Sequence, residues 1–113
     1  MRLFKAPRKD YDVQDLVDNG IADSGLFPKQ GAFWTRDEEF AGIWSHYWGA
    51  SKDDILVFDV RRKDWDNFMQ QFEDFADPDF FPGRREVVIP PILQKAFDEA
   101  TLNRTTLGTL NGN

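Results

Sequence analysis

Gly31-Ala32-Phe33-Trp34-Thr35 is the stretch around which we expect the fold to be organised. Its two aromatic residues favour the end of a short strand. Thr35 is followed three positions later by Glu38, a spacing that matches the capping box, in which both side chains bond free backbone N–H groups at a helix start. We therefore predict that the strand leads directly into a helix over residues 36–48.

One face of this predicted helix is strongly aromatic. Five of its side chains follow the i, i+3, i+4, i+7, i+8 spacing of a single apolar face. They are Phe40, Ile43, Trp44, Tyr47 and Trp48. Such a stripe is usually part of a protein core. A strand and a helix that both carry aromatic rings can also line a flat pocket suited to stacking, and the sequence leaves both interpretations open.

The length and composition indicate one folded domain. The chain has 113 residues, 41% of them hydrophobic, which is enough for a domain with its own core. Because it contains no cysteine, it forms neither disulfides nor a cysteine-ligated zinc site. Neither a signal peptide nor an apolar run of about 18 residues is present, so we expect a soluble cytoplasmic protein.

The net charge of −6 bears on the kind of partner. The chain has 14 Lys and Arg residues against 20 Asp and Glu residues. Binding to the phosphates of nucleic acids needs clustered basic side chains, so we expect no direct nucleic-acid binding. An acidic chain is better suited to a protein partner with a basic surface.

Hydrophobic periodicity and turn residues predict the remaining elements. We expect strands over 2–6, 55–60 and 86–89, helices over 11–19, 64–76 and 92–100, and a loop over 21–30. The almost continuously apolar run over 55–60 is typical of a central strand. Residues 1–100 then form a single compact α+β domain with a small mixed or antiparallel sheet and three or four helices. Residues 101–113 are expected to be a polar, frayed C-terminal tail.

Glu86 is the carboxylate with the most distinctive position. It begins a predicted strand that is ended by Pro90-Pro91, and a strand backbone is rigid enough to hold a catalytic side chain. The preceding Arg84-Arg85 should favour its charged form. The same position also suits a strand-edge ion pair. Metal binding is not indicated, because His46 is the single histidine and has no H-x-x-x-H partner.

Three segments resemble, in order, the motifs of the small ADP-ribosyltransferases, which include the poly-ADP-ribose polymerases and bacterial toxins. Leu3-Phe4-Lys5-Ala6 is similar to the strand that ends in a His or Arg gripping the nicotinamide ribose, with Lys5 at that position. The stretch 31–35 and the helix carrying Trp44 resemble the segment whose aromatic residue stacks on nicotinamide. Residues 85–91, Arg-Glu-Val-Val-Ile-Pro-Pro, resemble the strand whose Glu binds the ribose hydroxyls.

The resemblance implies an ADP-ribosyltransferase-like fold and an NAD-dependent mono-ADP-ribosyltransferase that modifies a protein or nucleic-acid target. The residues implied for binding NAD, by stacking or hydrogen bonding, are Lys5, Phe33, Trp34, Thr35 and Trp44. Glu86 would be the catalytic residue that stabilises the cationic sugar as nicotinamide leaves. Family members that modify arginine carry Gln or Glu two residues before this Glu. Arg84 stands there in this chain, which argues against an arginine acceptor.

A small acidic inhibitor without catalysis is the alternative interpretation. Six carboxylates lie within residues 64–79, with no basic residue among them. They are Asp64, Asp66, Glu73, Asp74, Asp77 and Asp79. A surface of this kind can mimic nucleic acid and occupy the basic channel of a DNA-binding protein, with charge complementarity speeding association. The simpler explanation is a solvated acidic helix face.

Overall fold

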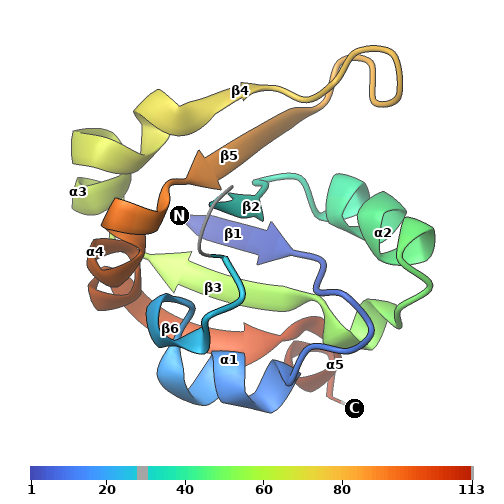
Figure 1. The fold of residues 1–113 in the computed structure, drawn as a ribbon, viewed down its shortest axis with the longest axis horizontal. Coiled ribbons are helices and arrows are strands. Elements are labelled where there is room, and N and C mark those ends of the chain that lie inside the picture. Colours follow the sequence, from blue (N-terminus) through green and yellow to red (C-terminus); the bar gives the residue numbers. More distant parts are fainter. Residues whose placement is uncertain (28–30, 113) are drawn as a thin grey trace.

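Two three-stranded antiparallel sheets frame the structure, a computed structural model that describes residues 1–27 and 31–112. Their strand orders are β1–β3–β6 and β2–β5–β4 (Figure 1). With the five α-helical segments found in the described residues, they confirm the predicted α+β class. The predicted loop over 21–30 lies partly outside the described residues, at positions 28–30.

β3 (Leu56–Val60) is the central strand of the first sheet, as its apolar run predicts. It pairs on one side with β1 (Arg2–Lys5) and on the other with β6 (Thr101–Thr106). Leu56 and Phe58 pack in the main core, whereas Val57 packs in a second cluster. Both faces of β3 are therefore buried, and this explains why apolar residues do not alternate with polar ones.

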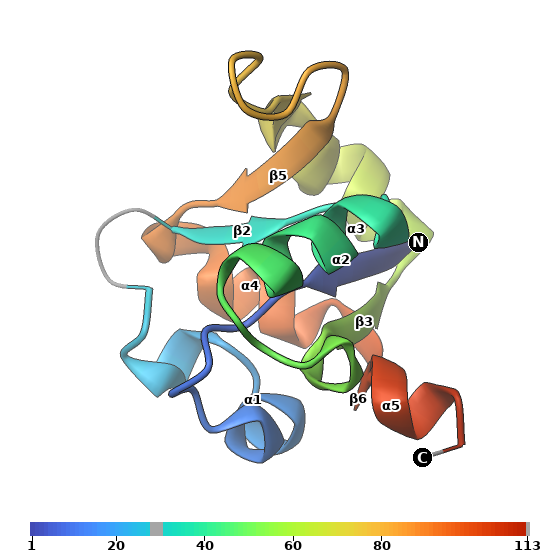
Figure 2. The same ribbon diagram turned by 90° about the vertical axis from the view of Figure 1, so that its right-hand side faces the viewer.

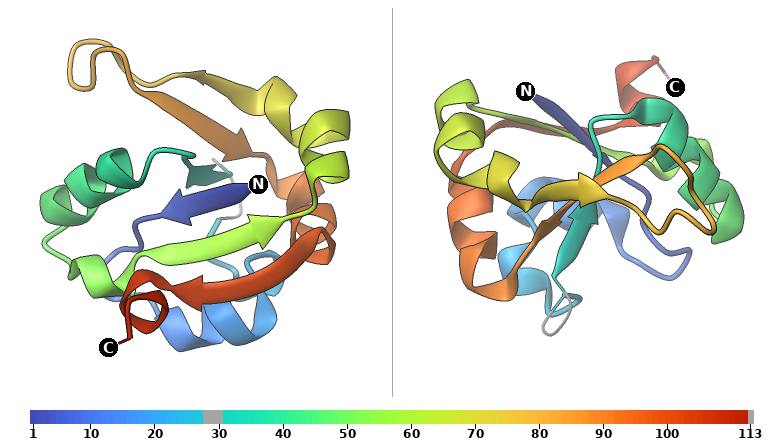
Figure 3. Two further views of the ribbon diagram at one scale, coloured as in Figure 1. Left: turned by 180° about the vertical axis from the view of Figure 1, so that it is seen from behind. Right: turned by 90° about the horizontal axis from the view of Figure 1, so that it is seen from above.

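Within residues 1–27 and 31–112, one isolated β-bridge joins the second sheet to the first. The second sheet consists of β2 (Ala32–Trp34), β5 (Arg85–Ile89) and β4 (Glu73–Phe75). Phe4 and Thr35 exchange two backbone hydrogen bonds, with N···O distances of 2.8 and 2.9 Å. The six strands consequently follow one another as β4–β5–β2–β1–β3–β6, an order that can be followed in Figure 3.

Side chains from both sheets share one core with α4 (Gln94–Glu99). Trp34 lies at its centre, with its ring centroid 4.8 Å from that of Phe58 and 5.0 Å from that of Phe97. A Trp ring buries a large apolar area, so this contact ties the two sheets to each other and to α4. None of the helices in the described residues is long and apolar enough to cross a membrane.

Helix α2 (Glu38–Tyr47) follows β2, but the predicted capping box is wrong. Asp37 is the N-cap, and its Oδ1 accepts a hydrogen bond from the Phe40 N–H at 3.1 Å. Thr35 still has extended backbone because it pairs with Phe4, and its hydroxyl donates to the Arg85 carbonyl at 2.9 Å. Aspartate is as good an N-cap as threonine, so the helix simply begins later.

The aromatic stripe of α2 is only partly a core face. Phe40 is fully buried, but Tyr47 is 70% exposed, and the helix buries Ala41 and Ser45 instead. Ala41 packs against Phe4 on the outer face of the first sheet. Figure 2 shows α2 lying in front of β1. The other aromatic side chains of α2 are left at a surface where they can line a pocket.

Helix α1 (Val13–Asn19) ends at Gly20, as predicted. Gly20 has φ of +80°, which strongly favours glycine, and a Cβ there would lie 2.5 Å from the Asp98 side chain. Asp98 accepts hydrogen bonds from the backbone N–H groups of Ile21 and Ala22 at 2.9 and 2.8 Å. This close approach lets α4 hold the segment that leaves α1.

The predicted helix over 64–76 is wrong for its last four residues, 73–76. The helical segment runs through α3 (Arg62–Asp64), a π-helical turn (Trp65–Met69) and a 3₁₀ turn (Gln70–Phe72), and residues 73–75 then form β4. Phe75 in β4 is 58% exposed, and the Arg85 guanidinium carbon lies 4.3 Å from the centre of its ring. The long-range pairing with β5 decides this conformation, and helical periodicity alone does not reveal it.

The expectation of a frayed tail after residue 100 is also wrong. β6 pairs with β3 along its length, and α5 (Leu107–Leu110) follows it, with the Leu107 N–H donating to the Ile55 carbonyl at 2.8 Å. Arg104 in β6 donates to the Val17 and Asp18 carbonyls at 2.9 and 3.2 Å, which satisfies the end of α1. The C-terminal segment is thus part of the domain.

Removing residues 101–113 should therefore abolish folding. Without β6, the central strand loses one of its two partners and the buried side chains around it become exposed. Urea titration followed by far-UV circular dichroism should show no cooperative transition for the chain ending at Ala100. A chain ending at Leu110 keeps β6 and should unfold like the full chain. Cooperative unfolding of the chain ending at Ala100 would mean that β6 is dispensable.

Candidate functional site

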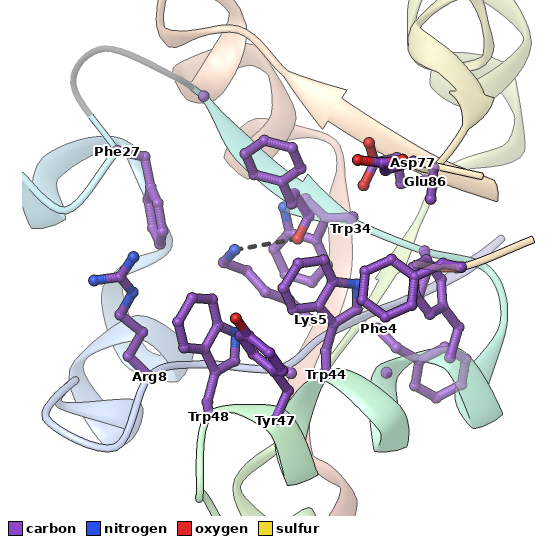
Figure 4. A pocket seen from close by; sticks show the side chains of 18 of the residues that line it. Phe4, Lys5, Arg8, Phe27, Trp34, Trp44, Tyr47, Trp48, Asp77 and Glu86 are labelled. Atoms are coloured by element: carbon purple, nitrogen blue, oxygen red, sulfur yellow. Dashed lines mark hydrogen bonds between the residues drawn. The ribbon is translucent and has the colours of Figure 1, made fainter. Parts of the chain in front are cut away.

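A cavity of about 750 Å³ opens beside the bridge that joins the two sheets. Its volume lies within the usual range of small-molecule sites, about 300–1,000 Å³. Its walls come from β1 and the segment after it, from β2, α2 and β5, and from the loop between β4 and β5. Most of the lining side chains shown in Figure 4 are aromatic, with a few charged groups among them.

All six residues that the family resemblance implies line this cavity. They are Lys5, Phe33, Trp34, Thr35, Trp44 and Glu86. The first and last of them, Lys5 in β1 and Glu86 in β5, lie 81 positions apart in the sequence. The Phe4–Thr35 bridge brings the end of β1 against the end of β2, and β5 lies directly beside β2. Segments far apart in the chain therefore supply one site.

Lys5 is a buried amine in the cavity wall. Lys5 is only 7% exposed, and its Nζ donates a hydrogen bond to the Phe33 carbonyl at 3.1 Å. Nζ also lies 4.6 Å from the centre of the Phe27 ring. No ion pair joins it to a carboxylate in the described part of the chain. Burial, with a smaller effect of the positive Arg8, lowers the pKa of Lys5 from 10.5 to about 7.

Glu86 is a half-buried carboxylate on β5, and the two neighbouring arginines do not favour its charge as predicted. Arg84 forms ion pairs with Asp37 and Glu39 at 2.6 and 2.7 Å, and Arg85 lies over the Phe75 ring. Burial raises the pKa of Glu86, and the negative charge of Asp74, opposite it on β4, raises the pKa further. Glu86 forms none of the ion pairs found among the described residues, so the strand-edge interpretation is not supported.

The aromatic residues of the cavity differ in what they offer a ligand. Trp34 is 1% exposed and packed in the core, so its ring faces are occupied by protein. Phe33, its neighbour on the strand, is 41% exposed. Trp44 is partly exposed and lies beside Trp48 and Phe81, at centroid distances of 5.7 and 4.9 Å. Phe33 and Trp44 are therefore the rings of the predicted set that a flat ligand can reach.

Thr35 has little hydrogen-bonding capacity left for a ligand. Its hydroxyl donates to the Arg85 carbonyl and accepts from the Asp37 N–H at 3.1 Å. A hydroxyl has one donor hydrogen, and that hydrogen is already used. The contribution of Thr35 to the site is thus to hold β2 against β5 and to begin the turn into α2.

Several lining residues were not predicted from the sequence. Arg8 and Phe27 lie beside Lys5, and Asp77 and Phe81 come from the loop between β4 and β5. Trp48 also lines the cavity, and its helical spacing from Phe40 already placed it on the aromatic face that could line a pocket. The other four lie in loops or irregular segments, where neither periodicity nor a motif marks a residue that faces a cavity.

Three of the six acidic residues noted within residues 64–79 form ion pairs with arginines. Asp64 pairs with Arg61, Asp66 with Arg62 and Glu73 with Arg36, with N···O distances of 2.6, 3.2 and 2.6 Å. Such pairs reduce the negative field that a nucleic-acid mimic would present. Among the described residues, no group of three His, Asp or Glu side chains is placed to hold a metal ion.

Replacing Lys5 with methionine should change how stability depends on pH. Between about pH 7 and pH 10.5, the unfolded chain holds a proton at Lys5 that the folded chain has released. Wild-type stability should therefore carry the full penalty below pH 7 and rise through this window. Lys5→Met should be more stable than wild type at pH 6, and its advantage should shrink by about 3 kcal/mol by pH 9.5, at about 1.36 kcal/mol per pKa unit.

Urea unfolding of both proteins at pH 6, 7.5 and 9.5 measures this difference. Lys63→Met, which removes an exposed amine, is the matched control and should differ from wild type by the same amount at each pH. A constant difference between wild type and Lys5→Met across these values would show that Lys5 keeps an ordinary pKa.

Comparisons with known proteins do not assign this site. A scan against models of protein families gave no match, and searches of the curated proteins and of the solved structures gave none. A fold by itself does not determine a function. The function of this chain must therefore be argued from the residues that line the cavity.

Proposed function

We propose that this chain is an NAD-dependent mono-ADP-ribosyltransferase that transfers ADP-ribose to a protein or nucleic-acid acceptor. The observation that carries the proposal is the convergence of the family-like motifs on one cavity. Lys5, Trp44 and Glu86 come from three separate segments of the sequence, and all of them line the same 750 Å³ space. The concentration of aromatic rings and the few polar groups there suit a ligand with a flat, polar ring.

The residues of the cavity fit nicotinamide and its ribose. Phe33 and Trp44 offer accessible rings for stacking. Lys5 holds its Nζ by one hydrogen bond to the Phe33 carbonyl, and its other N–H groups can donate to a carboxamide or ribose oxygen. Thr35 and Trp34 hold β2 in place, Thr35 by its hydrogen bond to the Arg85 carbonyl in β5 and Trp34 by packing in the core.

Glu86 supplies the charge that the reaction needs. The bond between C1 of the ribose and the nicotinamide nitrogen breaks, and nicotinamide leaves with the electron pair. A positive charge develops on the sugar, which the Glu86 carboxylate stabilises while accepting a hydrogen bond from a ribose hydroxyl. The acceptor nucleophile then forms a bond to C1 and loses its proton to solvent.

The acceptor is proposed to be a group other than arginine. Arg84 occupies the place where arginine-modifying members of the family carry Gln or Glu, and its guanidinium is engaged by Asp37 and Glu39. The exposed Phe80 and Asp79 lie in the loop that leads to this position. A protein partner with a basic surface would meet the remaining acidic side chains there.

Glu86→Gln should lower the rate of nicotinamide release by about 10²–10³-fold, because it removes one preorganised charge from the site. Binding of NAD should change little, since the stacking rings remain. The measurement is nicotinamide released from NAD by wild type and by the variant, with NAD affinity followed by tryptophan fluorescence. Glu99→Gln, at an exposed position on α4, is the matched control and should react like wild type. Equal rates for wild type and Glu86→Gln would exclude Glu86 from the reaction.

The pH dependence should respond to Asp74. Because burial and Asp74 both raise the pKa of Glu86, and the reaction needs the charged carboxylate, activity should fall on acidification at a higher pH than an ordinary glutamate would give. Asp74→Asn removes the neighbouring negative charge, so the midpoint of this fall should move to lower pH. Rate profiles between pH 4 and pH 8 for wild type and Asp74→Asn test this, with Asp66→Asn as the control. An unmoved midpoint would contradict the assigned electrostatics.

A further inference from the structure

The charged groups of the cavity are separated by sign. Lys5 and Arg8 are its only basic side chains among the described residues. Asp77 and Glu86 are its carboxylates. Figure 4 shows Arg8 on one side of the pocket and Asp77 and Glu86 on the opposite side, with aromatic rings between them. A ligand in this cavity therefore meets a positive end and a negative end.

Arg8 is the accessible cation of the positive end. Its side chain is exposed, and no ion pair joins it to a carboxylate in the described part of the chain. Its guanidinium carbon lies 4.6 Å from the centre of the Trp48 ring, a cation–π contact that orients the group without using its hydrogen-bond donors in the plane. The arginines at positions 2, 36, 61, 62 and 84, in contrast, all pair with carboxylates.

Lys5 does not replace Arg8 in this role. It is almost fully buried and one N–H is directed at the Phe33 carbonyl. Burial also leaves it uncharged in part of the population near neutral pH. A guanidinium stays charged at any physiological pH and presents a planar set of donors that matches two phosphate oxygens. Arg8 is thus the group in this cavity best suited to an anion.

We propose that Arg8 is a phosphate-binding residue that holds the diphosphate of the ligand at the mouth of the cavity. The identity of the ligand as a dinucleotide rests on the proposed function, whereas the anion site rests on Arg8 itself. With the diphosphate at Arg8, the positively charged nicotinamide ring is directed toward the carboxylates of Asp77 and Glu86. The reverse orientation would place the diphosphate against two carboxylates, so the charge separation fixes the direction in which the ligand enters.

Isothermal titration of wild type, Arg8→Gln and Arg62→Gln with three probes tests this proposal. The probes are ADP, which carries adenosine and the diphosphate but no nicotinamide, NAD, and nicotinamide, which has no phosphate. Arg8→Gln should bind ADP and NAD at least about 10-fold more weakly, the usual scale for a lost hydrogen bond to a charged group. Its affinity for nicotinamide should stay within about twofold of wild type. Arg62→Gln makes the same chemical change at an exposed site outside the cavity and should match wild type throughout.

The outcomes separate this proposal from the proposed function. ADP and NAD affinities that are unchanged in Arg8→Gln would overturn the phosphate site, even if wild type cleaves NAD. Weaker ADP binding by Arg8→Gln with no NAD cleavage by wild type would support the phosphate site and overturn the transferase. Wild type that binds neither ADP nor NAD would overturn both. Far-UV circular dichroism establishes that the variants are folded, and this is expected because both arginines are exposed.

Discussion

The two hydrogen bonds between Phe4 and Thr35 are the constraint on which the rest of the structure depends. They join the edge of one sheet to the edge of the other, with N···O distances of 2.8 and 2.9 Å. Lys5 follows Phe4 directly, and Phe33 and Trp34 precede Thr35. The bridge therefore places the amine beside the aromatic pair, while Trp34 packs into the core shared by both sheets. The same contact that completes the fold thus defines the position of the cavity.

The strands that could be predicted are those whose composition reflects burial. β3 is buried on both faces and β5 carries Val and Ile before two prolines, so both could be read from apolar runs. β4 and β6 are edge strands with mostly polar or exposed side chains, and their pairing with β5 and β3 decides their conformation. Sequence periodicity does not record such pairing, because the partner lies far away in the chain.

The structure brings Lys5, Trp44 and Glu86, which the motifs single out in the sequence, to the lining of one cavity. What each residue does in such a cavity is less visible in the sequence. The hydrogen bond of the Thr35 hydroxyl depends on Arg85, and the raised pKa of Glu86 depends on burial and then on Asp74, surroundings that only the fold creates. Arg84 shows the same limit, because its carboxylate partners, Asp37 at the N-cap of α2 and Glu39 in its first turn, lie 47 and 45 positions away in the sequence.

Two buried polar groups at the cavity reduce stability rather than add to it. Lys5 is buried without a carboxylate, and the Trp34 Nε1 has no hydrogen-bond partner among the described residues. A buried unsatisfied donor costs about 1–3 kcal/mol, and a hydrophobic side chain at position 5 would avoid the cost of an amine. A domain with a total stability of about 5–15 kcal/mol carries such costs mainly at binding sites, where the group acts on a ligand. The energetics of the fold and the geometry of the cavity therefore lead to the same residue, Lys5, beside the bridge that holds the two sheets together.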